Sequence, residues 1–474
     1  MREFDLNIEK VLENWSVAHA LREIIANALD EQALTRTREP VIFADAQGHW
    51  HVQDWGRGLR YEHLTQNENH EKLGNPDKVI GKFGVGLKDA LATFDRHGIA
   101  VTILSRHGDI TVGRVAKHDF PDLKTLHALV SPPTDPQRVG TDFILHGRAL
   151  GPAQIDEAKS LFLHYSGDSI AGSTAFGTVL ERVSRAAPGR IYVNGLRVAE
   201  EDNFLFSYNI TSPTTALRRA LNRERSNVGR SAYTDRVKAI LLACEEDAVI
   251  DAVIDDLQLY ARGVQHDETQ WIDVGVHACK QLNARSKVIF LSALDLAQAP
   301  DFLQRAADDG YRTVVVPETL STKLPRLRDA LGNPIRDLTR YREEWNSSFQ
   351  FTFTEPAKLT PRERAVWDTL PLIFAARGGR PARVKEIRIS ETMRLMDGRY
   401  QEAVGLWDPT DGLIIVKRDQ LQTLAAFAGT ILHEISHSSS GAPDVSLAFE
   451  DELTEETGRV VARLLSESKL TLRT

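Results

Sequence analysis

The stretch that most constrains the fold lies near the start of the chain, at residues 21–32, LREIIANALDEQ. Positions three and four apart share one face of a helix. The spacing predicts a helix with one buried apolar stripe, made of Leu21, Ile24, Ile25 and Ala28. Another face carries Glu23, Asn27 and Asp30. These polar groups can face solvent or can hold a ligand, and the motifs further along the chain favour the second interpretation.

Two strands are predicted next, at residues 41–43 and 50–52, with a turn at residues 46–48. The second strand runs into Asp54-Trp55-Gly56-Arg57-Gly58. Two spaced glycines let the backbone pass close to a flat ligand whose edge would meet the Asp54 carboxylate. A plain glycine turn is the alternative interpretation of this motif.

A polar segment, residues 60–80, is predicted to be a mobile loop and precedes the run GKFGVG at residues 81–86. Glycines just before a helix form a turn whose N–H groups can face phosphate oxygens. No GK[ST] ends this run, so it is not a Walker A loop. Residues 101–116 and 140–145 predict antiparallel sheet, and Gly140-Thr141 opens the last strand.

Four motifs therefore occur in order: ExxxNxxD on a helix, DxGxG after a strand, GxxGxG before a helix, and GT opening a strand. This arrangement resembles the GHKL ATPase superfamily, which includes gyrase, heat-shock chaperones, histidine kinases and MutL. The resemblance covers the first third of the chain. It implies a Bergerat-type α/β sandwich at residues 1–150 that binds ATP and Mg²⁺.

The resemblance also implies roles for single residues. Asn27 would hold Mg²⁺, because a hard cation prefers oxygen ligands. Glu23 would orient and deprotonate the attacking water, with Asp30 in a supporting role. The adenine would be bound by Asp54, Gly56, Gly58 and Thr141. The lid over the phosphates would contain Gly81, Gly84, Val85 and Gly86.

Residues 151–240 are predicted to form a second, transducer-like α/β domain. Strands are expected across residues 176–198, with a hairpin at Asn194-Gly195, and at residues 204–210. MutL- and gyrase-like proteins offer a basic side chain from this domain to the γ-phosphate. The candidates here are Arg223, Arg225 and Arg230. A solvated helix N-terminus is the alternative interpretation.

Residues 241–345 are predicted to be an α/β coupling region. A helical pattern at residues 241–260 precedes a strand at 287–291, a helix at 299–310 and a strand at 313–316. Strand, helix and strand at these lengths favour a parallel βαβ unit. Residues 321–360 are rich in charges and proline, and we expect a linker or an exposed arm there.

The C-terminal region, residues 361–474, carries His433-Glu434-Ile435-Ser436-His437 on a predicted helix at residues 424–437. Histidines at i and i+4 of an HExxH motif lie on one helical face and suit zinc. Glu434 would act as general base toward a metal-bound water. The region resembles zincin metallopeptidases and is expected to be mainly helical, with another helix at residues 448–465. A pair of surface histidines is the alternative interpretation.

Three carboxylates are candidates for the third zinc ligand. Glu450 is the first choice, and Glu456 lies near the spacing seen in thermolysin-like and ImmA-like proteins. Asp444 falls one residue beyond the third-ligand position of the HExxHxxGxxH pattern. The strand predicted at residues 412–416 is expected to be an edge strand that binds an extended peptide.

Composition narrows the functional classes. The net charge of −8 argues against a generally basic nucleic-acid-binding surface. Two cysteines, Cys244 and Cys279, in no metal-binding spacing indicate a reducing compartment. No apolar run approaches the ~20 residues of a membrane-spanning helix, so we expect a cytoplasmic protein with no membrane partner.

The sequence thus predicts an α+β multidomain ATPase whose nucleotide state gates a zinc peptidase acting on a protein or peptide. Dimerisation would occur through the ATPase domain, and such a gated protease would suit stress or antiphage defence. The alternative is an ATP-driven chaperone, or a DNA-associated clamp of the MutL or MORC kind, in which the HExxH region is structural.

Overall fold

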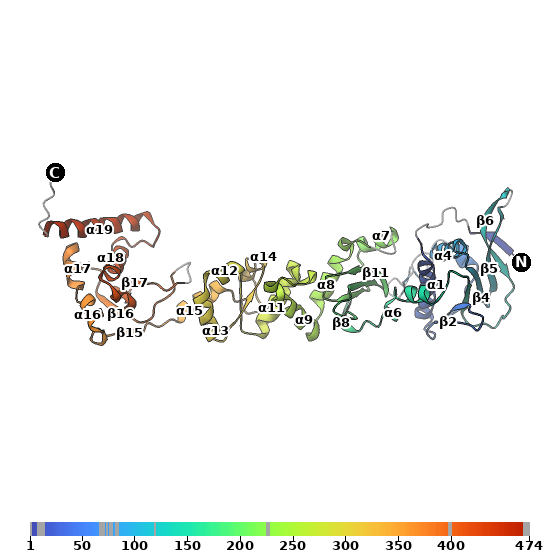
Figure 1. Cartoon of the computed structure of the whole chain (residues 1–474), viewed down its shortest axis with the longest axis horizontal. Coiled ribbons are helices and arrows are strands. Elements are labelled where there is room, and N and C mark those ends of the chain that lie inside the picture. Colours follow the sequence, from blue (N-terminus) through green and yellow to red (C-terminus); the bar gives the residue numbers. More distant parts are fainter. Residues whose placement is uncertain are drawn as a thin grey trace. The chain divides into compact units, whose positions relative to one another are not determined.

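The computed structural model describes residues 2–6, 15–65, 72, 74, 79–80, 85–117, 120–223, 228–396 and 401–467. The chain divides into two compact units, Met1–Gln281 and Leu282–Thr474. Both units contain helices and sheets (Figure 1), which confirms the expected multidomain α+β class. Among the described helices, none is long and apolar enough to span a membrane.

The N-terminal part of the first unit is built on a sheet of seven described strands, in the order β1-β6-β5-β4-β7-β3-β2. Each neighbouring pair is antiparallel, which confirms the antiparallel sheet predicted for residues 101–116 and 140–145. The strands are β1 (Arg2–Asp5), β2 (Val41–Ala44), β3 (Trp50–Gln53), β4 (Ala100–Ser105), β5 (Gly108–Lys117), β6 (Phe120–Ser131) and β7 (Thr141–His146).

Helices α1 (Val17–Thr35) and α4 (Val85–Arg96) share one hydrophobic core with this sheet and with α5 (Pro152–Lys159). The helix predicted at residues 21–32 is confirmed, and its apolar stripe is buried. Glu23 and Asp30 are buried as well, so the interpretation of a solvated polar face is wrong. The described residues of this part also include two four-residue helices, α2 (Glu62–Thr65) and α6 (Leu163–Ser166).

A second sheet in the same unit has the order β11-β10-β12-β9-β8. Asn194 and Gly195 have φ of 49° and 81° and join β10 to β11, which confirms the predicted hairpin. Its strands are β8 (Ile170–Thr174), β9 (Gly177–Leu180), β10 (Gly189–Val193), β11 (Leu196–Glu201) and β12 (Ser207–Ile210). The helices that follow in the chain are α7 (Thr215–Arg223), α8 (Thr234–Ala243), α9 (Asp247–Gln258), α10 (Asp267–Gln270) and α11 (Ile272–Arg285), and the last residues of α11 belong to the second unit.

Two predictions in this region need correction. The strand expected from residue 204 begins only at Ser207, because the N–H groups of Leu205 and Phe206 donate to the buried carboxylate of Glu268. The helical pattern at residues 241–260 is two helices, since the chain is extended at Cys244 between α8 and α9.

The second unit begins with the predicted βαβ arrangement. Strands β13 (Val288–Leu291) and β14 (Arg312–Val315) are parallel, with α12 (Ala293–Gln298) and α13 (Pro300–Asp308) between them. The linker expected at residues 321–360 is wrong, because α14 (Glu318–Ser321) and α15 (Leu338–Ser348) fall within or overlap it. Leu338 and Tyr341 of α15 are buried in the core around β13. They are three residues apart, as expected for one face of a helix, but most residues around them are polar or charged, so the helical pattern is weak in the sequence.

A sheet in the order β15-β16-β18-β17 lies in the C-terminal part. Its strands are β15 (Phe353–Thr354), β16 (Glu386–Ser390), β17 (Gly405–Asp408) and β18 (Leu413–Lys417). The predicted edge strand is β18, which pairs with β16 and β17 on its two sides. That prediction is therefore wrong, and β17 is an edge instead. The buried apolar run of β18 is typical of an interior strand.

Four α-helices of the described residues accompany this sheet: α16 (Pro361–Trp367), α17 (Leu370–Arg377), α18 (Leu424–Ser440) and α19 (Leu447–Glu467). The Thr423 side chain caps the start of α18, and Gly441, with φ of 66°, ends it. Phe427, Ile431 and Ile435 bury one face of α18 in the core. The predicted HExxH-bearing helix is thus confirmed as a helix.

Candidate metal centre and nucleotide site

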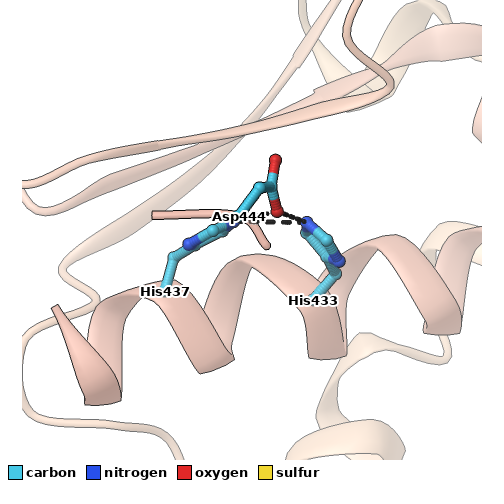
Figure 2. Close-up of side chains that lie close together, drawn as sticks. All are labelled: His433, His437 and Asp444. Carbon is cyan, nitrogen blue, oxygen red and sulfur yellow. Dashed lines mark hydrogen bonds and ion pairs between the residues drawn. The ribbon is translucent and has the colours of Figure 1, made fainter. Parts of the chain in front are cut away.

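Three potential ligand atoms meet beside helix α18. His433 and His437 rise from consecutive turns toward Asp444, as Figure 2 shows. Their Nε2 atoms are 3.2 Å apart, and each lies 3.1 Å from Oδ1 of Asp444. The chain reaches this geometry because Gly441 ends the helix in a left-handed turn, after which Asp444 lies over the two rings.

The hydrogen bond of His437 defines which of its nitrogens is the ligand atom. Its Nδ1 lies 2.9 Å from the carbonyl oxygen of Ala442, and a carbonyl can only accept. Nδ1 therefore carries a proton, and in the neutral ring Nε2 presents a lone pair. That lone pair faces the Asp444 oxygen, another acceptor. Two acceptors at this distance need a cation between them, either a proton or a metal ion.

The spacing of the three atoms fits zinc. Ligand atoms at about 2.0–2.2 Å from a tetrahedral Zn²⁺ lie about 3.3–3.6 Å from one another, slightly wider than the 3.1–3.2 Å separations here. Burial, partly offset by the charge of Asp444, lowers the pKa of His433, which favours the neutral form that a metal requires. The ring of Phe449 stacks on His437, with centroids 4.2 Å apart and planes 19° apart, and forms one wall.

Glu434 lies on the same helix but outside this cluster of three. Only 5% of the residue is exposed, and its carboxylate accepts the backbone N–H of Trp407 in β17. Burial, and then the charge of Asp444, raise the pKa of Glu434 to about 8. A carboxyl group poised in this range is suited to proton transfer near neutral pH.

The other two ligand candidates are placed elsewhere. Glu450 is exposed in the first turn of α19 and does not join the cluster within the described part of the chain. Glu456 is fully buried, and its carboxylate accepts from Arg377 at 2.5 and 3.1 Å. The geometry thus favours Asp444 over Glu450, the first choice from sequence. The extra serine before Gly441 obscured the ligand spacing.

The predicted adenine-binding residues come together at the ends of β3 and β7. The buried Asp54 carboxylate accepts the N–H groups of Gly56 at 2.8 Å and Thr141 at 3.2 Å. The Thr141 hydroxyl accepts the N–H of Leu59 at 2.9 Å. Burial, partly offset by these hydrogen bonds, raises the pKa of Asp54 to about 6.

Gly140 is required by this arrangement. Its φ is 81°, and a Cβ at this position would lie 2.0 Å from the carbonyl oxygen of Asp54. Gly58, with φ of 86°, also adopts the left-handed conformation that favours glycine. The two strands can therefore approach closely behind Asp54 only when residue 140 has no side chain.

The other predicted polar residues lie along α1. The ammonium of Lys72 donates to Oδ1 of Asn27 at 2.9 Å and to Oδ2 of Asp30 at 2.7 Å. Oδ1 of Asp30 accepts the N–H of Ile80 at 2.6 Å. Glu23 accepts from the buried guanidinium of Arg22 at 2.8 Å. The sequence did not predict that Lys72 and Arg22 are the partners of these polar residues. Lys72 in particular is far from α1 in sequence, and no helical or strand period relates the two.

The remaining candidates are resolved in part. Gly81, Gly84 and Arg225 lie outside the described residues. For Val85 and Arg223 the structure gives the backbone only, at the start of α4 and the end of α7. Gly86 lies in the first turn of α4 rather than before it. Arg230 is paired with Asp267 at 2.7 Å and with Glu201.

The fold and the two groups of candidate residues, one in each compact unit, define a multidomain α+β protein with a candidate metal centre. Residues 153–247 match the family model described as the Mycoplasma pneumoniae MPN635 N-terminal domain. An uncharacterized protein of Mycoplasma pneumoniae is 36% identical over 246 residues, which span 51% of this chain and 97% of that protein. The chain belongs to the family of that protein. A second uncharacterized protein of the same species is 24% identical over 352 residues, 69% of this chain and 96% of its own length.

Proposed function

We propose that this protein is an ATP-binding and ATP-hydrolysing protein of the GHKL type whose nucleotide state gates a zinc-dependent peptidase in its C-terminal region. The peptidase half rests on one observation above all. Nε2 of His437, with its lone pair fixed by Ala442, converges with His433 and Asp444 at zinc-ligand spacing.

The proposed chemistry assigns each residue of the C-terminal site one task. His433, His437 and Asp444 would hold zinc, which when bound would lower the pKa of water and polarise the scissile carbonyl. Glu434 accepts the proton of the attacking water on its carboxylate. Edge strand β17, which lies against Glu434, is the place where an extended peptide would pair.

The nucleotide half is supported by the polar network at α1. Oxygens of Asn27 and Asp30 face a cation, the ammonium of Lys72. Carboxylate and amide oxygens of this kind suit Mg²⁺. Asp54, tied to Gly56 and Thr141, is suited to accept the adenine amino hydrogen. Glu23 would orient and activate water for hydrolysis.

The proposed partners follow from these two sites. The substrate is a protein or peptide, the ATPase domain supports a homodimer, and the setting that suits a nucleotide-gated protease is stress or antiphage defence in the cytoplasm. Nucleic acid is a partner only in the DNA-clamp alternative, and no membrane partner is proposed.

The direct test compares protein cleavage with and without ATP. A cell lysate is incubated with the protein, and new protein N-termini are mapped by mass spectrometry for wild type, Asn27→Ala and Glu434→Gln. We expect cleavage to depend on nucleotide in wild type, to lose that dependence in Asn27→Ala, and to vanish in Glu434→Gln. Cleavage that is indifferent to nucleotide contradicts the gating. ATP-dependent client or DNA binding that survives Glu434→Gln, with no cleavage, supports the chaperone or clamp alternative.

A further inference from the structure

The carboxylate of Glu434 lies against the backbone of edge strand β17. We propose that Gly405, at the start of this strand, is a positioning residue for Glu434. The absence of a side chain at residue 405 leaves room for the carboxylate, which then takes the N–H of Trp407 two residues further along. This inference rests on the proposed peptidase function, because the positioning matters only if Glu434 acts as a base.

The available space is the first piece of evidence. A Cβ at Gly405 would lie 2.5 Å from Oε1 and 2.9 Å from Cγ of Glu434. It would also lie 2.6 Å from Cγ2 of Thr430. Thr430 and Glu434 are one turn apart on α18, so both present the same face of the helix to β17. Any side chain at residue 405 would have to displace one of them.

Backbone conformation does not explain the glycine. Gly405 pairs with Val416 of β18 in extended backbone, which any residue adopts. The constraint is therefore steric and directed at α18. Contacts below 3.0 Å force a shift, and the shift is easiest at the flexible end of a side chain. The carboxylate of Glu434 is such an end, whereas Thr430 is β-branched and stiff. An alanine at residue 405 should move the carboxylate off Trp407 while the strand stays paired.

The test uses a small probe, because the protein substrate is unidentified. Acetohydroxamic acid binds a metal through its deprotonated hydroxyl oxygen, and the proton passes to a nearby base, here the carboxylate of Glu434. The protein is loaded with Co²⁺, and probe affinity is read from the visible spectrum. We expect Gly405→Ala to retain a full equivalent of Co²⁺ but to bind the probe about 10- to 100-fold more weakly, as loss of a supporting contact at a metal site does. Glu434→Gln sets the limit of the effect.

A matched control separates positioning from general helix perturbation. Gly429 lies on the same helix, and a Cβ there would meet nothing within 4 Å. Gly429→Ala should bind Co²⁺ and the probe as wild type does. The double variant Gly405→Ala with Thr430→Ser removes the clash with Cγ2 and retains the hydroxyl. It should recover the thermal midpoint of unfolding without recovering probe affinity, and it gives a folded protein if Gly405→Ala alone does not fold.

Three outcomes would overturn the inference. Wild-type probe affinity in Gly405→Ala shows that Glu434 does not need the space. Recovery of affinity by Thr430→Ser shows that only crowding on α18 matters. A wild-type protein that binds neither Zn²⁺ nor Co²⁺ removes the proposed peptidase and the positioning role together, which distinguishes this failure from the first two.

Discussion

Asp444 illustrates how much depends on one residue. Its Oδ1 is 3.1 Å from both histidine nitrogens, although the carboxylate itself is largely exposed. An exposed carboxylate gains little from burial or from a surface ion pair. Its position beside the Nε2 atoms of both histidines is what a shared cation would explain, as the proposed function requires.

We expect Asp444→Ala to lower zinc affinity by at least about tenfold, because a ligand contributes more than the groups that support it. The measurement is a competitive titration with a chromophoric chelator. Glu450→Ala is the matched control, since Glu450 is also exposed and lies nearby in sequence but outside the cluster. Equal zinc affinity in Asp444→Ala and wild type, with a loss in Glu450→Ala, would restore Glu450 as the third ligand.

Gly140 offers a comparison at the proposed nucleotide site. Gly48 and Gly140 have nearly the same φ, 82° and 81°, but a Cβ at Gly48 would meet nothing within 4 Å. We expect Gly48→Ala to cost about 1–2 kcal/mol of unfolding free energy, the strain of a left-handed residue. Gly140→Ala should cost about 1–3 kcal/mol more, because its Cβ overlaps the Asp54 carbonyl. Chemical denaturation measures both.

Nucleotide binding separates the two glycines further. A shifted Asp54 should weaken binding of a fluorescent ATP analogue in Gly140→Ala, while Gly48→Ala keeps wild-type affinity. Equal stability and equal nucleotide binding in the two variants would show that the segments around Asp54 and Gly140 can move apart without loss of stability or of nucleotide affinity.

At the scale of elements, helices α17 and α19 are joined by the buried pair Arg377 and Glu456. The Glu456 side chain is fully buried and that of Arg377 nearly so. Removing one partner of a buried pair leaves the other charge without compensation. We therefore expect Glu456→Ala to destabilise the second unit by about 3–5 kcal/mol at unchanged zinc stoichiometry.

Glu452→Ala on the same helix is the control for that variant. Its partner, Arg459, is half exposed, and a surface pair of this kind contributes about 0–1 kcal/mol. If zinc is lost from Glu456→Ala while the protein remains folded, Glu456 is a metal ligand and not a structural acid.

Helix α10 makes the first unit sensitive to pH through Glu268. Burial, partly offset by hydrogen bonds from Leu205, Phe206 and Tyr208, raises the pKa of Glu268 to about 7. A raised pKa means that the folded state binds the proton more tightly, so the stabilisation is present at low pH and is lost as pH rises through about 7. The loss amounts to at most about 3 kcal/mol.

Glu268→Gln cannot ionise and should escape that loss. Thermal unfolding of wild type and Glu268→Gln should give similar midpoints at pH 5 and a higher midpoint for the variant at pH 8. The opposite order at pH 8 would mean that the three donors stabilise the carboxylate more than burial opposes it.

The elements also show what sequence can predict. The helix at residues 21–32, the Asn194-Gly195 hairpin and the HExxH helix were predictable because their periods and turn residues are local. The edge position of β17 was not, since pairing depends on strands far apart in sequence. Helix α15 was missed because its buried residues Leu338 and Tyr341 lie in a stretch that is mostly polar and charged. The choice of Asp444 needed the turn at Gly441, and Lys72 needed the folded chain.

At the scale of the whole molecule, the proposed gating links a site in the first compact unit to a site in the second. Such coupling is a free energy, commonly about 1–3 kcal/mol, and it is reciprocal. Whatever nucleotide does to the affinity of the zinc site for a ligand, that ligand must do to the affinity for nucleotide. The whole scheme requires first that the C-terminal site hold a metal.

The most direct measurement is therefore the metal content of the purified, full-length protein by inductively coupled plasma mass spectrometry, with wild type and His437→Ala compared. We expect one zinc ion per wild-type chain, removed by chelation and restored by added Zn²⁺, and none in His437→Ala at unchanged folding of the first unit. A wild-type chain that holds no zinc and takes up none would contradict the proposed zinc peptidase.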